Sequence, residues 1–90
     1  MNKVKMNSVE SSNINAIGYT PENEFSGRLY IEFHRGSVYQ YFDVEERVYG
    51  ELMQAKSVGQ TFHHLVKGGA YRFERIAIPG HKADFAPEFA

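Results

Sequence analysis

The sequence contains no cysteine, which excludes a disulfide framework, a thiol nucleophile and every zinc site that uses cysteine ligands. Proline is also scarce, with three residues in 90, and no low-complexity tract interrupts the chain. No hydrophobic run approaches the roughly 18 residues that a membrane-spanning helix needs, so we expect no transmembrane segment and no membrane partner. What remains is the composition of a soluble globular protein, with 42% hydrophobic and 23% charged residues.

An excess of one charge is missing as well, since 10 lysines and arginines face 11 aspartates and glutamates, for a net charge of -1. The chain therefore lacks the overall basic character of a dedicated nucleic-acid binder. The charges are unevenly distributed: residues 10–51 hold eight acidic and three basic side chains, whereas residues 56–82 hold five basic side chains and Glu74. This distribution fits either an ordinary mixed surface or a basic C-terminal patch that meets an anionic partner.

A chain of 90 residues forms one domain with a modest core and leaves no room for a second. We expect this domain to occupy residues 11–78, between a flexible N-terminus at residues 1–10 and a flexible tail at residues 79–90. The N-terminus has basic residues, but the hydrophobic stretch of a signal peptide does not follow them. The cytoplasm is therefore the expected location.

Apolar residues predict three strands in the first half of the chain, at residues 14–19, 28–33 and 37–42. The second and third of these are joined by residues 34–36, which fit a three-residue hairpin loop with Gly36 in the left-handed conformation. The two strands are therefore expected to pair as an antiparallel hairpin.

The length of this loop decides which face of the sheet carries Tyr39 and Tyr41. A three-residue loop pairs these two tyrosines with Ile31 and Leu29, respectively, so both rings lie beside the aliphatic stripe. A two-residue loop would send both rings to the opposite face. We favour the three-residue loop.

Helical periodicity follows the hairpin and predicts a first helix from about Val44 to Lys56. Asp43 and Glu46 have the spacing of a capping box at its start. A shorter second helix is predicted over residues 60–67, where Gly68 and Gly69 stop it by allowing positive φ.

The joint between the helices falls at residues 57–59, where we expect Ser57 to cap a helix end and Gly59 to turn the chain with positive φ. A last strand is predicted over residues 70–78. The order β-β-β-α-α-β indicates an α+β fold, a small antiparallel sheet with two short helices packed on one face.

The sequence offers no catalytic motif and no set of metal ligands. Ser57 lacks the first glycine of a nucleophile elbow, and Gly68 and Gly69 lack the Gly-Lys-Ser/Thr sequel of a phosphate-binding loop. His63 and His64 are neighbours on a helix, so they diverge by roughly 100°, and neither has a third ligand four residues on. We therefore expect no enzyme activity, no metal and no cofactor.

The aromatic residues are more suggestive, because Tyr39 and Tyr41 lie on one face of a strand with their rings about 7 Å apart. Such a pair can stack nucleobases, or it can be a core pair whose hydroxyls reach the sheet edge. Both interpretations stay open at this point. The candidate binding residues are these tyrosines, the basic residues of the second half and two histidines: Tyr39, Tyr41, Lys56, Lys67, Arg72, Arg75, His63 and His64.

An ordered series of short motifs runs along the chain from Val9 to Ile76: Ser11-Ser12, Ile14, Ile17-Gly18-Tyr19, Leu29, Ile31, Phe33, Gly36, Tyr39-Gln40-Tyr41, Val44, Val48-Tyr49, Leu52, Ala55, Ser57, Gly59, Phe62, Tyr71 and Phe73. This series resembles the KTSC domain, a short module also found at the C-terminus of some lysyl-tRNA synthetases. The resemblance implies no established activity, and it suggests RNA binding only through the attachment to a synthetase. Members that stand alone are small bacterial and phage proteins, as this chain looks to be.

The chain departs from the family pattern in its second helix and last strand, which usually carry several arginines and an asparagine. Here His63 replaces the asparagine, His64 and Ala70 replace arginines, and Glu74 stands where a basic residue is common. This loss of positive charge weakens the RNA interpretation, because phosphate contacts supply most of the affinity for nucleic acids.

Two hypotheses of different class remain. The first is a non-enzymatic module that binds RNA or another single-stranded nucleic acid weakly, through the two tyrosines and the C-terminal basic patch. The alternative is a protein-protein interaction module with an aromatic docking surface or a docking tail at Phe85 and Phe89, such as a phage-encoded inhibitor or a binder of a small nucleotide ligand. We favour the first because the tyrosines and the C-terminal charge agree with it.

Overall fold

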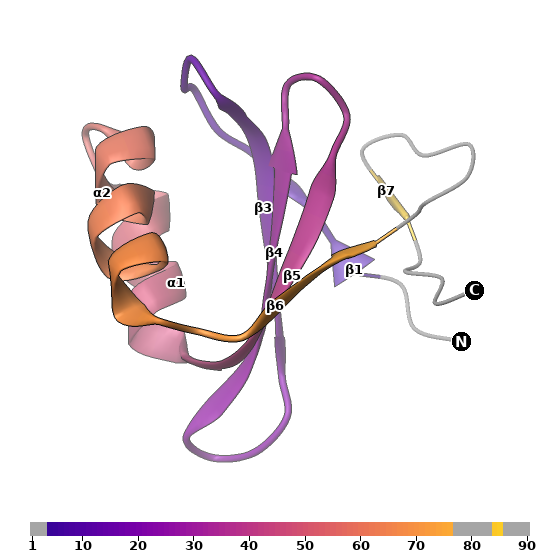
Figure 1. Cartoon of the computed structure of the whole chain (residues 1–90), viewed down its shortest axis with the longest axis vertical. Helices are drawn as coiled ribbons and strands as arrows, with labels where there is room; N and C mark the ends of the chain where they lie inside the picture. Colours follow the sequence, from indigo (N-terminus) through magenta and orange to yellow (C-terminus); the bar gives the residue numbers. More distant parts are fainter. Residues whose placement is uncertain (1–3, 77–83, 86–90) are drawn as a thin grey trace.

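Five strands form one antiparallel sheet in the order β2-β3-β4-β5-β6, and two helices cover one of its faces (Figure 1). This computed structural model describes residues 4–76 and 84–85. The elements are β1 (Val4–Lys5), β2 (Asn7–Ser8), β3 (Ile14–Pro21), β4 (Ser26–Phe33), β5 (Val38–Glu45), α1 (Glu46–Gln54), α2 (Val58–Leu65), the 3-10 turn η1 (Lys67–Gly69), β6 (Phe73–Ile76) and β7 (Asp84–Phe85). The predicted α+β fold is confirmed. We call the face that carries the helices the helix face and the opposite one the outer face.

The β4–β5 hairpin has the register that a three-residue loop predicts. Leu29 pairs with Tyr41 and Ile31 with Tyr39, and the Phe33 amide donates to the Ser37 carbonyl at 2.8 Å. Gly36 takes the left-handed conformation with φ of 100°, as expected. Both tyrosines therefore lie on the helix face, beside the aliphatic stripe.

The main core lies between the helix face and the two helices. Alternate positions of the strands meet residues spaced four apart on the helices, which is the packing that amphipathic elements of these periods require. Its buried members are Ile14, Ile17, Leu29, Ile31, Tyr41, Val44, Val48, Leu52, Val58, Phe62 and Val66.

The predicted capping box at Asp43 is wrong. Strand β5 continues to Glu45, which pairs with Ser26, and α1 begins at Glu46 without a side-chain cap. Asp43 has φ of 57° and lies opposite the point where the β4–β5 register shifts by one residue. Aspartate tolerates this conformation in a bulge, and pairing with β4 outweighs the local capping signal.

The start of α2 confirms one expectation and corrects another. Ser57 caps the helix, because its Oγ accepts from the amide of Gln60 at 3.4 Å. Gly59 lies inside α2, and among the described glycines only Gly36 has positive φ, so the predicted turn at Gly59 is wrong. The helix therefore starts two residues earlier than predicted.

The end of α2 also differs from the prediction. The helix ends at Leu65, and Gly68 and Gly69 continue into η1 instead of taking positive φ. The left-handed residue is Ala70, with φ of 60°, which turns the chain toward β6. Strand β6 covers only Phe73–Ile76 of the predicted residues 70–78. The last two of these lie outside the described residues.

A second, smaller core covers the outer face and uses residues that we expected to be flexible. Val4 and Met6, within residues 1–10, are 3% and 7% exposed. They pack with Ala16, Tyr30, Val38 and Ile76. A Cβ atom on Gly18 would come within 2.7 Å of the Met6 Sδ, so the glycine allows this close approach. The expectation for residues 1–10 thus differs from the structure at β1 and β2.

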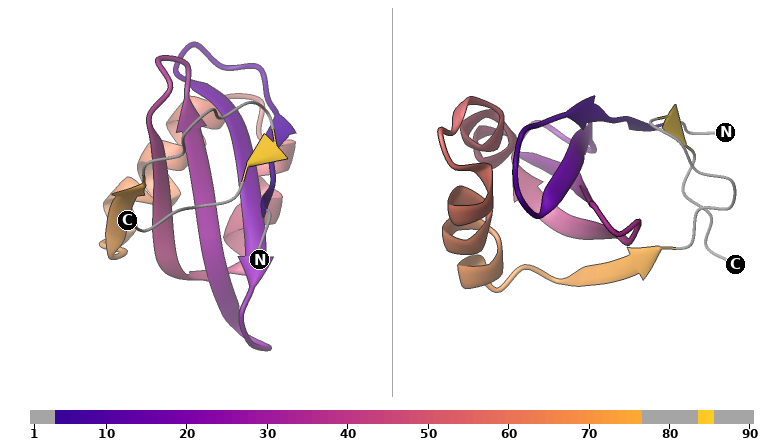
Figure 2. Two further views of the ribbon diagram at one scale, coloured as in Figure 1. Left: turned by 90° about the vertical axis from the view of Figure 1, so that its right-hand side faces the viewer. Right: turned by 90° about the horizontal axis from the view of Figure 1, so that it is seen from above.

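Part of the expected tail also pairs with the N-terminal segment, since β1 and β7 align Val4 with Phe85 (Figures 1 and 2). The rest of residues 79–90, including Phe89, lies outside the described residues. No helix found in residues 4–76 is long and apolar enough to cross a membrane. The cytoplasmic location stays a prediction.

Candidate functional site

A groove with a volume of about 710 Å³ lies between the helix face of the sheet and α2. We call it the aromatic groove, because six aromatic side chains line it: Phe33, Tyr39, Tyr41, Phe62, Tyr71 and Phe73. Four of them are on β4, β5 and β6, where strand alternation points them to the same face, and α2 contributes Phe62. The groove thus joins residues from both halves of the chain.

The rings form a connected cluster in which Phe73 is the most exposed ring. Phe73 lies 5.5 Å from Tyr41 and 5.9 Å from Tyr39, measured between ring centroids. Tyr41 also contacts Phe62, at 5.8 Å. Phe73 is 54% exposed, whereas Tyr41 is 6% exposed and Tyr39 is half-buried. Tyr41 is therefore the floor of the groove, and Phe73 with Tyr39 is the surface that a ligand can reach.

The buried position of Tyr41 also decides its ionisation. Burial, with a smaller contribution from Tyr39, raises the pKa of the Tyr41 hydroxyl to about 12. A tyrosine is neutral at physiological pH in any case, and the raised pKa keeps this hydroxyl protonated well into the alkaline range. Of the two interpretations of the tyrosine pair, the core interpretation holds for Tyr41.

The charged residues that line the groove are all basic. Arg35, in the β4–β5 turn, and Lys67, in η1, are the two cations, and His34 and His63 accompany them. Neither aspartate nor glutamate is found among the lining residues. An anionic ligand would therefore meet attraction in this groove, although the net charge of the chain is -1.

Hydrogen bonds hold the turn at one end of the groove. The ring of His34 donates from Nε2 to the carbonyl oxygen of Ser11 at 2.7 Å. The His34 amide donates to the carbonyl oxygen of Asn13 at 2.9 Å. These contacts tie the β4–β5 turn, which carries Arg35, to the segment before β3.

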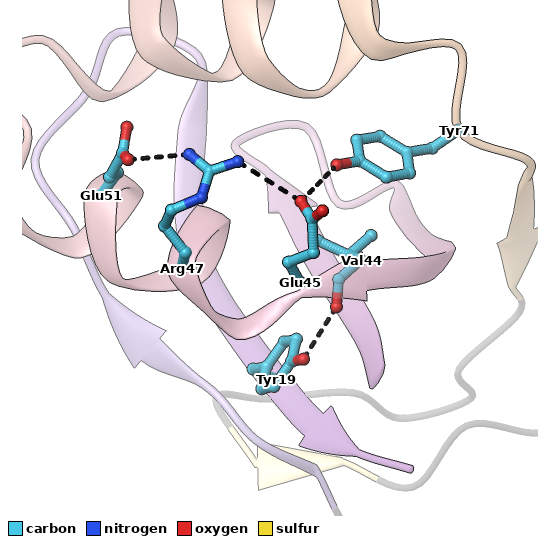
Figure 3. Close-up of polar contacts among 6 residues, drawn as sticks. All are labelled: Tyr19, Val44, Glu45, Arg47, Glu51 and Tyr71. Atoms are coloured by element: carbon cyan, nitrogen blue, oxygen red, sulfur yellow. Dashed lines mark hydrogen bonds and ion pairs between the residues drawn. The ribbon is translucent and has the colours of Figure 1, made fainter. Parts of the chain in front are cut away.

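Tyr71 is held by a chain of polar contacts along the start of α1 (Figure 3). Its hydroxyl donates to Glu45 at 3.4 Å, and Arg47 contacts both Glu45 and Glu51, at 3.4 and 3.0 Å. Burial and the negative charge of Glu45 raise the pKa of Tyr71. In the same view Tyr19 donates to the Val44 carbonyl at 2.8 Å, which links β3 to the end of β5.

The structure brings only some of the predicted binding residues together. Lys67 and His63 line the aromatic groove with the two tyrosines. Arg75 pairs with Tyr39 across β5 and β6, so it shares the helix face. The predicted basic patch therefore has members at or beside the groove.

The other predicted residues lie elsewhere. Arg72 lies on the outer face, where its guanidinium carbon is 4.2 Å from the centroid of the Phe42 ring. Lys56 and His64 line a neighbouring, more polar hollow of about 700 Å³ at the start of α2, which includes Glu10 and shares Ser12, Asn13, Gly59 and His63 with the aromatic groove. The basic residues of the second half therefore do not form one continuous patch.

Sequence reasoning missed Phe73, the accessible ring of the groove. Its local signal is the alternation of Tyr71 and Phe73 at the start of β6, but its partner Tyr41 on β5 lies more than 30 residues earlier in the chain. Among the described residues, no cluster of three or more His, Asp or Glu side chains could hold a metal ion.

Comparison with known proteins supports the family that the motifs suggest. The KTSC domain matches residues 10–72 of this chain. A lysine–tRNA ligase of a Nostoc species is 40% identical over 68 residues, which are 76% of this chain and 11% of the ligase. A protein of Tsukamurella paurometabola is 36% identical over 73 residues, which cover 81% of this chain and 100% of that protein.

A solved structure shows the same fold. The crystal structure of a KTSC domain protein from Yersinia pestis superimposes with a TM-score of 0.71 at 36% sequence identity, covering 82% of this chain and 99% of that one. The family consists of small domains with no known catalytic role. On the match over residues 10–72 and on this structural likeness, the chain is a member of the KTSC domain family.

Proposed function

We propose that this chain is a non-enzymatic module that binds single-stranded RNA, weakly, in the aromatic groove. The observation that carries the proposal is the accessible ring of Phe73, which lies against Tyr39 and Tyr41 in a groove whose charged lining is entirely basic. Aromatic platforms beside cations are the general means by which proteins hold single-stranded nucleic acids.

The aromatic residues have different roles in this proposal. Phe73 and Tyr39 offer faces on which a base stacks, and each stacked base contributes about 1–3 kcal/mol. Tyr41 is buried beneath Phe73 and supports its ring. The base thus contacts the edge strand β6 and its neighbour β5.

Phosphate contacts come from Arg35 and Lys67, with Arg75 next to them on the same face. So few cations give weak binding, micromolar or poorer at physiological salt, and a shallow dependence on salt. RNA is the favoured nucleic acid because several relatives are lysine–tRNA ligases, whose name states a tRNA substrate. The groove chemistry itself also accepts single-stranded DNA.

The stacking part of the proposal is tested by fluorescence anisotropy with a labelled single-stranded RNA at about 20 mM and about 150 mM salt. Phe73→Ala is expected to weaken binding by about 1–3 kcal/mol. The matched control is Phe25→Ala, because Phe25 is 78% exposed and is not among the residues that line the groove. Equal affinities of the two variants would contradict the stacking role.

The phosphate part has its own pair of variants. Lys67→Gln is expected to weaken binding to every RNA sequence and to lower the salt slope by about 0.7. Lys56→Gln removes the same charge at a position that does not line the aromatic groove, and it is expected to weaken binding less than Lys67→Gln does. If neither RNA nor single-stranded DNA binds at about 20 mM salt, the proposal fails, and a protein-interaction module becomes the better account.

A further inference from the structure

Strand β6 is an open edge of the sheet. Within residues 4–76 and 84–85 it pairs with β5 and with no other strand. Both views of Figure 2 show β6 as the outermost strand on its side of the sheet. Phe73, Glu74 and Arg75 are exposed, and Ile76 is buried. An edge of this kind is free to pair with a further strand.

The register with β5 shows which backbone groups of β6 face outward. The Phe42 amide donates to the Arg72 carbonyl at 2.9 Å, so residues 42 and 72 are a hydrogen-bonded pair. Hydrogen-bonded and non-hydrogen-bonded pairs alternate in an antiparallel ladder. Glu74 therefore bonds toward β5, whereas the amides and carbonyls of Phe73 and Arg75 point to the open edge.

The charges along this edge are complementary to themselves. If a second copy pairs antiparallel with Phe73 opposite Phe73, then Arg72 lies opposite Glu74 on the outer face, twice by symmetry. On the helix face, Tyr71 then lies opposite Arg75. Registers centred on Arg72, Glu74 or Arg75 instead place like charges directly opposite each other, which is destabilising.

The two charged side chains of the outer face are already held at the edge. Arg72 stacks on Phe42 at 4.2 Å, and Glu74 accepts a hydrogen bond from Gln40 Nε2 at 3.1 Å. Neither side chain makes an ion pair with another described residue. Each is therefore available to a charge of opposite sign on a second chain.

We infer that two copies of this chain associate through β6, antiparallel and centred on Phe73, to form one continuous ten-stranded sheet. Charged residues usually protect an edge strand from pairing, but here their order selects a second copy as the partner. A strand of four residues buries much less area than a standard interface, so the dimer is weak, with a dissociation constant on the order of 100 μM. This inference does not depend on nucleic-acid binding.

The test is sedimentation velocity of the full chain from about 20 μM to about 1 mM, with two charge reversals. In a dimer of Arg72→Glu, the new carboxylate lies opposite the carboxylate of Glu74. In a dimer of Glu74→Arg, the new guanidinium lies opposite that of Arg72. Each variant is therefore expected to raise the dissociation constant at least tenfold. Lys56→Glu makes the same charge change as Arg72→Glu, but away from the edge, and is expected to have no effect. An equal mixture of the two reversed variants restores both ion pairs and is expected to dimerise like the original chain.

Circular dichroism shows whether each variant folds on its own. Recovery of the dimer in the mixture then shows that the loss in each single variant came from the reversed charge and not from unfolding. A chain that stays monomeric at about 1 mM overturns the inference. So does a mixture that stays monomeric although the unmodified chain dimerises, since the dimer would then use another surface.

A cysteine scan reads the register independently, because the chain has no cysteine of its own. Directly opposed Cα atoms of a hydrogen-bonded pair are about 5.5 Å apart, which a disulfide can bridge. Phe73→Cys is therefore expected to form a disulfide-linked dimer under mild oxidation, and Arg75→Cys is not, because its symmetry mate lies four residues along the strand. Equal cross-linking of both variants would overturn the register.

Discussion

The two faces of the sheet arise from the same alternation of side chains, yet one of them is closed and the other is partly open. On the outer face, Val4 and Met6 cover the strands closely, and the buried polar residues Glu32 and Gln40 lie among them. On the helix face, a larger core ends in a groove lined by aromatic and basic side chains. The face with more buried residues is thus also the one that offers a site.

The sizes of the side chains explain this difference. Gly18 has no side chain, so the backbone of Lys5 and the side chains of Val4 and Met6 approach the outer face directly. On the helix face, the rings of β4, β5 and β6 keep α2 at a distance, and α2 reaches the sheet through Phe62. The small residue Gly18 therefore allows close packing on the outer face, whereas the aromatic rings leave a groove on the helix face.

The largest expected effect comes from a substitution that creates a cavity in the core of the helix face. Leu52 of α1 is fully buried, so Leu52→Ala is expected to lower the free energy of unfolding by about 2–5 kcal/mol. Urea denaturation followed by circular dichroism measures the loss. Leu65→Ala, at a half-buried position of α2, is the control and should lose less. A loss below about 1 kcal/mol for Leu52→Ala would show that α1 contributes little to the core.

The closed face is tested by adding one methyl group. Gly18→Ala places a Cβ atom 2.7–2.9 Å from Met6, Val4 and the Lys5 carbonyl, so we expect it to destabilise the fold by about 1–3 kcal/mol. The control, Gly50→Ala, meets nothing within 4 Å on α1 and should be stabilising by about 0.5–1 kcal/mol. Similar effects of the two variants would mean that β1 does not pack tightly on the outer face.

Alkaline pH tests the burial of Tyr41 at the floor of the groove. The unfolded chain loses the Tyr41 proton near pH 10, whereas the folded chain keeps it to about pH 12. Over this interval the unfolded state binds fewer protons, so stability falls as pH rises, by at most about 1.4 kcal/mol per pH unit for each such tyrosine. Tyr41→Phe is expected to make the fall less steep in urea unfolding series at pH 9–12.

Tyr19, Tyr30 and Tyr71 have raised pKa values as well, chiefly through burial, so part of the fall should remain in that variant. If Tyr41→Phe and the original chain lose stability with the same slope, Tyr41 ionises as easily in the folded chain as in the unfolded one.

The smallest expected effects concern the start of α2, which forms a wall of the groove. Ser57→Ala removes the cap and should lower stability by about 1 kcal/mol. Gly59→Ala should raise stability by about 0.5–1 kcal/mol, because a Cβ atom there meets only Ser11 Oγ, at 3.6 Å, inside a helix. Thermal unfolding measures both. If Gly59→Ala destabilised the fold, the result would favour the positive φ that the sequence predicted at Gly59 over a helical conformation.

Local signals were sufficient for the β4–β5 hairpin and for its consequences. The three-residue loop with Gly36 sets the register, and the register places Tyr39 and Tyr41 on the helix face. The Ser57 cap is equally local, since donor and acceptor lie three residues apart. The fold class, the strands β3 to β6, the two helices and the family follow from such short-range patterns and from the series of motifs between Val9 and Ile76, whereas β1, β2 and β7 do not.

Tertiary structure alone decided the features that join distant segments. Strand β5 continues through Asp43 because Glu45 pairs with Ser26 of β4, so no helix cap forms at Asp43. Val4 and Met6 join the second core because Gly18 leaves space for their side chains. The sequence by itself determined which face carries the two tyrosines. Only the pairing of Tyr41 with Phe73, 32 residues later, decided which ring is accessible and which is floor, because cross-strand packing depends on neighbours that no local pattern specifies.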